Sequence, residues 1–361
     1  MAIVNRRIKV MHIISGDLWA GAEVQAYTLL KFLREECDLH VVLMNHGELE
    51  TRLAALGIPV TVIDESRHNS ISILLKLRKL IMSVRPHIIH THRQKENILG
   101  SLANFFCYRA PCVRTSHGAS EFAAQGIRQL QVILDRLVGQ YLQDAIISVS
   151  EDLARKLKVH FPARKIHIIK NGVDVESLKR AAEDHFVFSD LSAVHLGIVG
   201  RLEPVKRVDI FLKVAALMKK KRHGLCFHVI GDGKLREQLE QMCRELQIED
   251  IVHFHGHCKN IAAYLNSLNI LIMCSDHEGT PMTALESLAV GTPLIAHSVG
   301  GLNEILSSCP EFLVTNNVPE IYVEKIEAYL STSQTKVDRL QPHYSAIYNA
   351  SKVTQLYCSI C

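Results

Sequence analysis

The sequence lacks the features that define several large classes of protein. No run approaches 18 apolar residues, so a membrane-spanning helix is excluded. Lys plus Arg (41) barely exceeds Asp plus Glu (37), and a formal charge of +4 attracts polyanions so weakly that we expect no nucleic-acid partner. The start of the chain lacks the long apolar segment and cleavage site of a signal peptide, so we expect a cytoplasmic protein. Peripheral contact with the inner face of the cell membrane is compatible with these absences.

Paired cysteines are also lacking. The ten cysteines have irregular spacing and lie mostly in apolar segments, which is typical of small buried hydrophobic residues in a reducing compartment. We therefore expect no disulfide. Cys358 and Cys361 form one CxxC without a second pair, and Ser359 departs from the aliphatic position of a lipidation box, so the meaning of this pair stays open.

Two nucleotide-binding signatures are absent. The glycines after the first apolar run do not form GxGxxG, and the second run ends at Met44 without the acidic residue that would hold a ribose, which disfavours a dehydrogenase. No Asp-x-Asp occurs, so a metal-bridged diphosphate would lack its usual ligands. His253, His255 and His257 alternate beside Cys258, but on one strand they would be spread over about 13 Å, too far for one ion. We expect no metal and no cofactor.

Short apolar runs alternate with segments of helical period, the pattern of parallel sheets covered by helices. The predicted fold class is α/β. In the first half the predicted strands are Ile8–Ile14, Leu39–Met44, Val60–Ile63, His87–His90, Cys112–Thr115, Ala145–Val149 and Ile166–Ile169, and the clearest helices are Gly21–Leu33, Ile71–Val84, Ile127–Gln140 and Glu151–His160. In the second half the predicted strands are His195–Val199, Cys226–Ile230, Ile251–Phe254, Ile270–Met273 and Leu294–Ala296.

The strand pattern starts afresh at His195, which predicts two sheets rather than one. The stretch Glu176–Ala193 has no strand pattern, and we place the connection between domains there. We expect an N-terminal domain over 1–180 and a C-terminal domain over 181–340. Aromatic and aliphatic residues at near-helical spacing over 341–361 predict a last helix that crosses back to the first domain.

The strongest chemical signal is the stretch from Glu278 to Glu286, which follows a buried strand and opens an apolar helix. Thr280 fits the N-cap and Pro281 the first helical position. The amides of Met282 and Thr283 would then point out of the positive end of the helix, where a phosphate binds well. Both carboxylates could border one ligand, and a carboxylate suits a pair of vicinal sugar hydroxyls.

A second signal follows the predicted strand that ends at Val199. Arg201 offers a planar fork and Lys206 a point charge, and together they can neutralise a diphosphate. The alternative is an ordinary solvated basic turn.

The first domain contributes weaker signals. Gly16 and Gly21 would let the backbone approach a ligand after the first strand. His117 follows the strand Cys112–Thr115, at the sheet edge where open α/β proteins bind ligands, and His90 and His92 occupy a similar edge. Each could equally be a hydrogen-bonded histidine of structural value only.

Together these motifs resemble the family 4 retaining glycosyltransferases of GT-B fold, over nearly the whole chain. The motifs that carry the resemblance are the glycine turn after strand one, Ser116-His117-Gly118, Ser148-Val-Ser-Glu151, Lys170-Asn-Gly-Val-Asp174, Gly200-Arg201 with Lys206, Gly231-Asp-Gly233 and the Glu-x7-Glu of Glu278 and Glu286. The resemblance implies two Rossmann-like domains facing a central cleft. It also implies a metal-independent hexosyltransferase that uses a UDP- or GDP-linked sugar. The implied acceptor is a glycan or lipid-linked glycan, as in polysaccharide or lipopolysaccharide synthesis.

The resemblance also implies roles for single residues. Glu286 would hold the donor ribose, and Arg201 with Lys206 the diphosphate. Glu278 and the residues after it would contact the transferred sugar, with His117 reaching that sugar from the other domain. The remaining implied donor contacts are Gly16 and Gly21, Gly256 and His257 near the base, and Gly279, Thr280, Pro281, Met282 and Thr283.

Two departures from the family pattern concern donor contacts. Pro281 stands where many relatives have glycine, which removes one backbone donor, and Ala20 also occupies a common glycine position. Two other readings stay open: a nucleotide-sugar epimerase on the same fold, which would need no acceptor, and a non-catalytic domain that binds nucleotide sugars.

Overall fold

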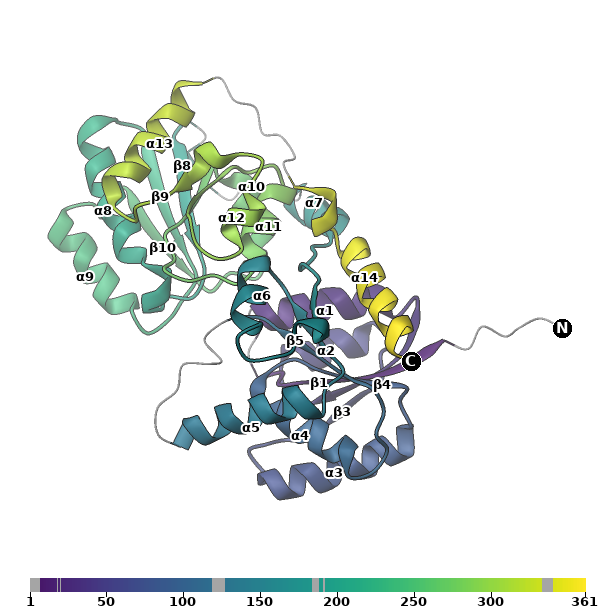
Figure 1. Cartoon of the computed structure of the whole chain (residues 1–361). Helices are drawn as coiled ribbons and strands as arrows, with labels where there is room; N and C mark the ends of the chain where they lie inside the picture. Colours follow the sequence, from purple (N-terminus) through teal and green to yellow (C-terminus); the bar gives the residue numbers. More distant parts are fainter. Residues whose placement is uncertain are drawn as a thin grey trace. The chain divides into compact units, whose positions relative to one another are not determined.

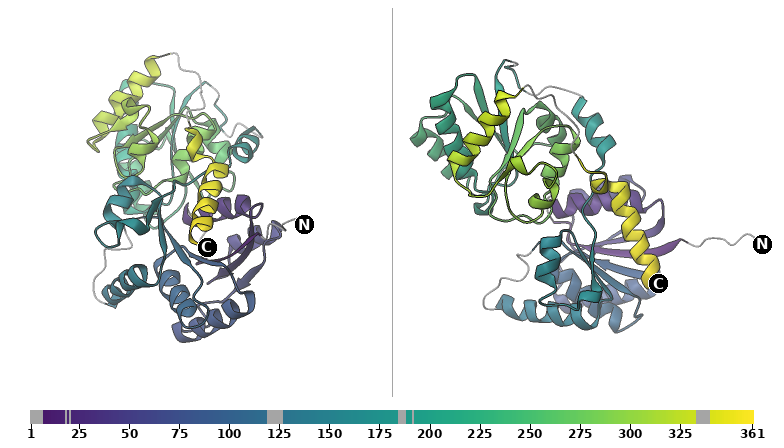
Figure 2. Two further views of the ribbon diagram at one scale, coloured as in Figure 1. Left: turned by 45° about the vertical axis from the view of Figure 1, so that its right-hand side comes forward. Right: turned by 45° about the horizontal axis from the view of Figure 1, so that its top comes forward.

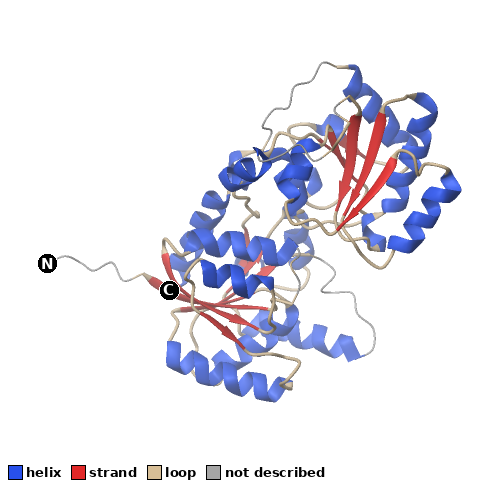
Figure 3. Ribbon diagram, turned by 180° about the vertical axis from the view of Figure 1, so that it is seen from behind, coloured by secondary structure: helices blue, strands red, loops and turns tan. Residues whose placement is uncertain are grey.

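The computed structural model describes residues 7–17, 19, 21–118, 127–183, 188–190, 192–332 and 340–361. Ala20 and the segment 119–126 therefore lie outside the described residues. The chain forms two compact units: unit 1 comprises Met1–Gly172 and His343–Cys361, and unit 2 comprises Val173–Pro342. Each unit is a parallel sheet between layers of helices (Figures 1 and 3).

Unit 1 contains a seven-stranded sheet of order β3-β2-β1-β4-β5-β6-β7. Its strands are β1 (Ile8–Ile14), β2 (Cys37–Leu43), β3 (Val60–Val62), β4 (Ile88–Thr91), β5 (Cys112–Ser116), β6 (Ala145–Ser148) and β7 (Ile166–Ile168). Its helices are α1 (Gly21–Leu33), α2 (Glu48–Ala55), α3 (Ser70–Val84), α4 (Gln94–Phe105), α5 (Ile127–Tyr141), α6 (Glu151–Leu157) and α14 (Ala346–Ile360), with 3-10 turns η2 (Ala163–Lys165) and η5 (Pro342–Tyr344) at its edges.

Strand β1 at the centre of the sheet has apolar side chains on both faces, because helices cover both. Val10 and Ile14 of β1 pack in one core with α1, α2 and α14. Met11 and Ile13 of the same strand pack in a second core with α3 and α4. Successive side chains of β1 point to opposite faces of the sheet, so this one strand contributes to the cores beneath both helical layers.

Unit 2 contains a six-stranded sheet of order β10-β9-β8-β11-β12-β13. Its strands are β8 (Val194–Val199), β9 (Leu225–Ile230), β10 (Val252–Gly256), β11 (Ile270–Met273), β12 (Leu294–His297) and β13 (Leu313–Val314). Its helices are α7 (Val175–Glu183), α8 (Val208–Lys221), α9 (Arg236–Leu246), α10 (Ile261–Ser267), α11 (Met282–Ala289), α12 (Leu302–Ile305) and α13 (Pro319–Ser331), with 3-10 turns η3 (Pro204–Lys206) and η4 (Pro310–Phe312).

The stretch between the two sheets differs from the sequence expectation. The division falls between Gly172 and Val173 rather than after residue 180, and part of the expected connection is helix α7. This helix belongs to unit 2, where side chains at the start and end of α10 cap it: Asn260 donates to the carbonyl of Ala181 at 3.0 Å and Asn266 to that of Ala182 at 3.1 Å. The sequence suggested a linker because α7 is a short amphipathic helix without a strand pattern, and the side chains that cap it come from another helix, α10.

The last helix, α14, packs on α1 in unit 1 (Figure 2). The side chain of Ser345 caps it by accepting from the amide of Tyr348 at 3.2 Å. Its second anchor is Asn349, whose amide donates to the carbonyl of Lys170 at 2.6 Å. Within the described residues, no helix is both long enough and apolar enough to cross a membrane.

Candidate functional site

Each sheet reverses its strand order once, and the strongest predicted residues follow the strands at these reversals. In unit 1 the reversal lies between β1 and β4, and in unit 2 between β8 and β11. Loops from such neighbouring strands diverge and leave a crevice at the carboxyl edge, where open α/β sheets bind ligands. Gly16 follows β1, whereas in unit 2 Arg201 follows β8 and Glu278 follows β11.

An ion pair joins the two strongest motifs of unit 2. The Nζ of Lys206 donates to Oε1 of Glu278 at 2.6 Å. The Glu278 side chain is 9% exposed and that of Lys206 is 25% exposed. A carboxylate this buried needs a partner, and the lysine provides one while its remaining N–H donors stay free to reach an anion.

Arg201 follows Gly200 at the end of β8, and a Cβ on Gly200 would lie 3.5 Å from Cε of Lys206. The side chain of Arg201 is exposed, and its guanidinium makes no hydrogen bond to another described residue. Close backbone packing positions it: a Cβ on Gly231 would lie 2.0 Å from the carbonyl oxygen of Gly200. The two glycines therefore allow the backbones at the ends of β8 and β9 to touch. Arg201 follows directly, and the five N–H donors of its guanidinium are available to a ligand.

Helix α11 begins one residue later than its sequence suggests. Pro281 is the N-cap, with φ −70° and ψ 120°, so Thr280 is not the cap and Pro281 is not the first helical residue. The physical reason is the extended ψ of Pro281, which starts the helical turn only at Met282. Ala284 and Leu285 donate to the Pro281 carbonyl at 3.2 and 3.4 Å. The amides of Met282 and Thr283 thus stand at the open, positive end of the helix.

Glu286 lies in the second turn of α11 and is half-buried. No described donor reaches its carboxylate, and burial raises the pKa of this carboxyl to about 7. An acceptor that is half-buried and lacks a donor is suited to a ligand that brings hydroxyl groups.

Two glycines that the sequence analysis missed support the Glu278 loop. A Cβ on Gly300 would lie 1.8 Å from the carbonyl oxygen of Glu278, and one on Gly301 would lie 2.2 Å from that of Gly279. The amide of Gly301 also donates to the Gly279 carbonyl at 2.8 Å. The sequence does contain a signal for this contact, because consecutive glycines shortly after a strand often mark a close approach of two backbones.

The histidines of β10 do not group along their own strand. Nε2 of His255 lies 2.9 Å from Nδ1 of His228, whose Nε2 lies 2.9 Å from Nδ1 of His195. The contacts run across three neighbouring strands, whereas His253 and His257 are exposed. Gly256, with φ +69°, bridges to Gly231 and so lies at the same edge as Arg201.

In unit 1 the glycine turn after β1 is tightly packed. Gly16 has φ +79°, and a Cβ on Gly47 would lie 2.3 Å from the Gly16 carbonyl oxygen. Gly21 opens α1 with open space around it. Glu23, in the first turn of α1, is buried and pairs with Arg93 at the start of α4.

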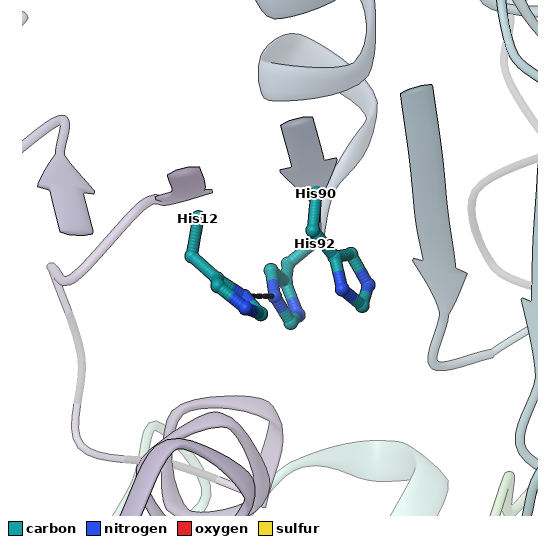
Figure 4. A group of neighbouring side chains, drawn as sticks. All are labelled: His12, His90 and His92. Carbon is teal, nitrogen blue, oxygen red and sulfur yellow. Dashed lines mark hydrogen bonds between the residues drawn. The ribbon is translucent and has the colours of Figure 1, made fainter. Parts of the chain in front are cut away.

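A chain of hydrogen-bonded rings leads inward from His117. Figure 4 shows three of its members, His12, His90 and His92, with the hydrogen bond that joins His12 to His92. Nε2 of His117 lies 3.4 Å from Nδ1 of His92, whose Nε2 lies 3.1 Å from Nδ1 of His12. Nε2 of His12 lies 3.3 Å from the hydroxyl of Tyr357. The same hydroxyl meets Nδ1 of His90. The sequence analysis noted three of these histidines singly and missed His12 and Tyr357.

These histidines are neutral near pH 7. Burial lowers the pKa of His12 to about 3 and that of His117 to about 4, and it holds those of His90 and His92 well below the usual range. One nitrogen each of His12, His90 and His92 lies within 4.8 Å of the others, so the three could approach one ion. All six of their nitrogens already face hydrogen-bonding partners, however, and the rings of His90 and His92 stack at 4.5 Å. The geometry fits a hydrogen-bonded chain.

Comparisons with known proteins agree with this architecture. Residues 189–344 match the model of glycosyl transferases group 1, and residues 19–177 match that of glycosyltransferase family 4. The chain is 25% identical over 336 residues to the UDP-Gal:alpha-D-GlcNAc-diphosphoundecaprenol alpha-1,3-galactosyltransferase of Escherichia coli, covering 84% of this chain and 82% of that protein.

Two solved structures show the same fold. Anabaena HepE in complex with UDP and glucose gives a TM-score of 0.83 at 18% identity, over 98% of this chain and 100% of that chain. A UDP-GlcNAc 2-epimerase from Neisseria meningitidis gives 0.69 at 15% identity, over 98% of this chain and 100% of that chain. Two Rossmann-like parallel-sheet units with these relatives define a GT-B protein of the glycosyltransferase class. The chain belongs to glycosyltransferase family 4.

Proposed function

We propose that this protein transfers a sugar, with retention of configuration, from a nucleotide diphosphate sugar to a glycan or lipid-linked acceptor at the inner face of the cell membrane. The observation that carries the proposal is the Lys206–Glu278 ion pair beside the exposed Arg201 and the open end of α11. These groups follow the neighbouring strands β8 and β11 at the reversal of the sheet, and they combine two cations, a buried carboxylate and a helix N-terminus, as a charged leaving group beside a sugar would require.

The diphosphate would bind to Arg201, Lys206 and the amides of Met282 and Thr283. As the bond to the sugar breaks, negative charge grows on the departing phosphate, and these donors would stabilise that charge. In such a front-face reaction the departing phosphate accepts the proton of the attacking hydroxyl, so no separate general base is needed. The proposal therefore assigns no metal and no cofactor to the reaction.

The sugar and ribose would be held by carboxylates. Glu278, paired with Lys206, would accept hydrogen bonds from sugar hydroxyls, and Gly279, Thr280 and Pro281 would border the same sugar. Glu286, whose carboxylate no donor of the described residues reaches, would accept from both ribose hydroxyls. In unit 1 the proposal assigns His117 to the transferred sugar, Gly16 and Gly21 to the phosphates, and in unit 2 Gly256 and His257 to the base.

The base is proposed to be uracil and the acceptor lipid-linked. The support is the galactosyltransferase of Escherichia coli, whose name gives a UDP sugar and an undecaprenol-linked acceptor, and the HepE complex with UDP. A role in the synthesis of surface polysaccharide or lipopolysaccharide follows from that acceptor.

The epimerase reading is kept as a second candidate, because the fold also resembles an epimerase. An epimerase would change the configuration of the sugar without an acceptor. A transferase would consume the donor only when an acceptor, or water in its place, takes the sugar.

The test is thermal unfolding with UDP, GDP and ADP and their sugars. A ligand at about 100 times its Kd stabilises the folded state by about 2.7 kcal/mol, so the transition of unit 2 should rise by several degrees with one base only. Glu286→Ala should abolish this shift, whereas Glu249→Ala, which removes an exposed carboxylate elsewhere in unit 2, should retain it. If no nucleotide shifts the transition of the unaltered protein, the proposed donor site is wrong.

A further inference from the structure

Exposed large hydrophobic side chains are concentrated on one helical layer of unit 1. Among the described residues, unit 2 exposes a single one, Val205. Helices α3, α4 and α5, which pack against one another in that order, carry most of the rest (Figure 1). We call these residues the α3–α5 surface: Ile71, Leu75 and Met82 on α3, Phe105, Phe106 and Tyr108 at the end of α4, and Leu130, Ile133, Leu134, Leu137 and Tyr141 on α5.

Helix α5 turns its larger apolar face away from its own core. Residues 130, 133, 134, 137 and 141 form one stripe at helical spacing, and Leu130 is 60% and Tyr141 70% exposed. The buried residues of the inward face are Val132, Asp135, Val138 and Gly139, whose apolar side chains are smaller than those of the exposed stripe. An amphipathic helix in a water-soluble domain normally has the opposite orientation.

Two contacts fix this orientation. Nη1 of Arg114 on β5 donates to Oδ1 of Asp135 at 2.7 Å, and both side chains are almost fully buried. Removing either partner would leave an unpaired buried charge. A Cβ on Gly139 would lie 2.5 Å from the Phe161 ring and 2.6 Å from the Arg114 guanidinium, so the helix approaches the sheet through its glycine. The exposed stripe therefore cannot turn inward without breaking a buried ion pair.

Charge on the α3–α5 surface has one sign. The exposed charged side chains of α3 are Lys76, Arg78 and Lys79, and the segment after α4 adds Arg109. Among the described side chains of these helices, the acidic ones, Glu96 and Asp135, are buried. Arg109 lies 4.7 Å over the Phe105 ring, so cationic and aromatic groups are interleaved.

The combination of exposed apolar side chains with cations favours an anionic bilayer over a second copy of the chain as the partner of this surface. A symmetric dimer through this surface would place the same patch on both copies, so the lysines and arginines of one copy would face those of the other. An anionic bilayer instead attracts each of these cations and accepts leucine, isoleucine and aromatic side chains below its headgroups.

We propose that the α3–α5 surface docks on an anionic lipid bilayer, with α5 lying in the plane of the headgroups and the cations of α3 binding lipid phosphates. The inference rests on the proposed function only in one respect: a lipid-linked acceptor would be met at the surface where this face is held. The docking itself follows from the exposure, the orientation of α5 and the single sign of charge.

The test measures binding to vesicles of phosphatidylcholine with and without phosphatidylglycerol, by flotation of the full chain. The unaltered protein should float with the anionic vesicles and not with the neutral ones at low salt. Leu130→Gln with Leu134→Gln should lower the partition coefficient by at least about tenfold at every salt concentration. Lys76→Glu with Lys79→Glu should lower it by at least about tenfold at low salt and by much less at high salt.

Matched controls separate this surface from exposed residues in general. Val159→Gln with Ile347→Gln changes two side chains that are 78% and 68% exposed on other parts of unit 1. Lys220→Glu with Arg222→Glu makes the same change in net charge on exposed residues of unit 2. Both control pairs should bind vesicles within about twofold of the unaltered protein, since neither lies on the α3–α5 surface.

Each outcome has a defined meaning. Failure of the unaltered protein to float with anionic vesicles, or equal binding by all four variant pairs, overturns the inference. If the protein is a dimer that Leu130→Gln with Leu134→Gln converts to monomer, without vesicle binding, the surface binds a second copy and the inference is also overturned. Nucleotide-dependent thermal shifts on the same preparations report on the donor site alone, so the two proposals can fail separately.

Discussion

The hydroxyl of Tyr357 lies 2.5 Å from Nδ1 of His90 although 267 positions separate the two residues in the chain. The same hydroxyl lies 3.3 Å from Nε2 of His12. A hydroxyl has one proton, so it donates to one of these imidazoles and accepts from the other. The last helix is thereby fixed to β1 and β4 at the reversal of the first sheet.

Tyr357→Phe should destabilise unit 1 by about 1–3 kcal/mol, because it leaves nitrogens of two buried imidazoles without a partner. Chemical denaturation measures the change. The control is Tyr348→Phe on the same helix, where the ring is 46% exposed, and there the stability should change by less than about 0.5 kcal/mol. Equal stabilities of the two variants would show that the hydroxyl of Tyr357 contributes nothing.

Arg201→Ala and Lys206→Ala should each lower turnover on the order of 100-fold or more, since each removes a donor aimed at the developing phosphate charge. Initial rates of sugar transfer measure the effect. Lys213→Ala, which removes an exposed lysine of α8 that only pairs with Asp209, should leave turnover unchanged. Unchanged turnover in both site variants would remove the proposed diphosphate site.

Glu286→Gln should affect stability and nucleotide affinity in opposite directions. The folded pKa of about 7 lies above the ordinary carboxyl value, so the folded state binds the proton more tightly and its stability falls as pH rises from about 4.5 to 7. The glutamine does not ionise. At pH 8 without nucleotide, the variant should therefore be more stable on the order of 1–2 kcal/mol, with little difference at pH 5.

The same variant should bind nucleotide more weakly at pH 8, because it lacks the carboxylate that is proposed to accept from the ribose. Affinity of the unaltered protein should fall between pH 8 and 6 as Glu286 is protonated, and the variant should lack this dependence. Thermal melts across pH with and without UDP give both quantities. A pH-independent affinity in the unaltered protein would contradict the assignment of Glu286 to the ribose.

Gly300→Ala should impair transfer and stability more than Gly224→Ala. Both glycines have positive φ, +51° and +71°, so both substitutions strain the backbone by about 1 kcal/mol. Only at Gly300 would the new Cβ also meet a backbone atom, the carbonyl oxygen of Glu278 at 1.8 Å. The difference in melting temperature and in initial rate between the two variants measures this contact, and no difference would show that the Glu278 loop moves freely.

Most elements could be predicted from local sequence because their signals are local. The apolar runs predicted all seven strands of unit 1, and Gly21–Leu33 coincides with α1. Strand β13 was missed, since its two residues are too few to show a pattern. The start of α11 was misplaced by one residue because the sequence does not report the ψ angle of Pro281.

For helix α5, the periodicity of apolar residues does not decide which face of the helix is buried. Its pattern predicted a helix, and an apolar stripe would ordinarily be assigned to the core. The buried Arg114–Asp135 pair and the contact at Gly139 place the opposite face inward. Asp135 lies on the helix itself, but its partner Arg114 lies on β5, 21 positions away in the chain, so the orientation is a tertiary property.

The sequence by itself determined the two-sheet α/β class, the family and the residue types of the donor motifs, because these depend on short patterns in fixed order. Only the tertiary structure decided which of those residues meet. Lys206 and Glu278 are 72 positions apart, and they pair because β8 and β11 are neighbours where the sheet reverses. His12, His90 and Tyr357 meet for the same reason in the first sheet, since strand order and the return of α14 bring distant side chains within hydrogen-bond reach.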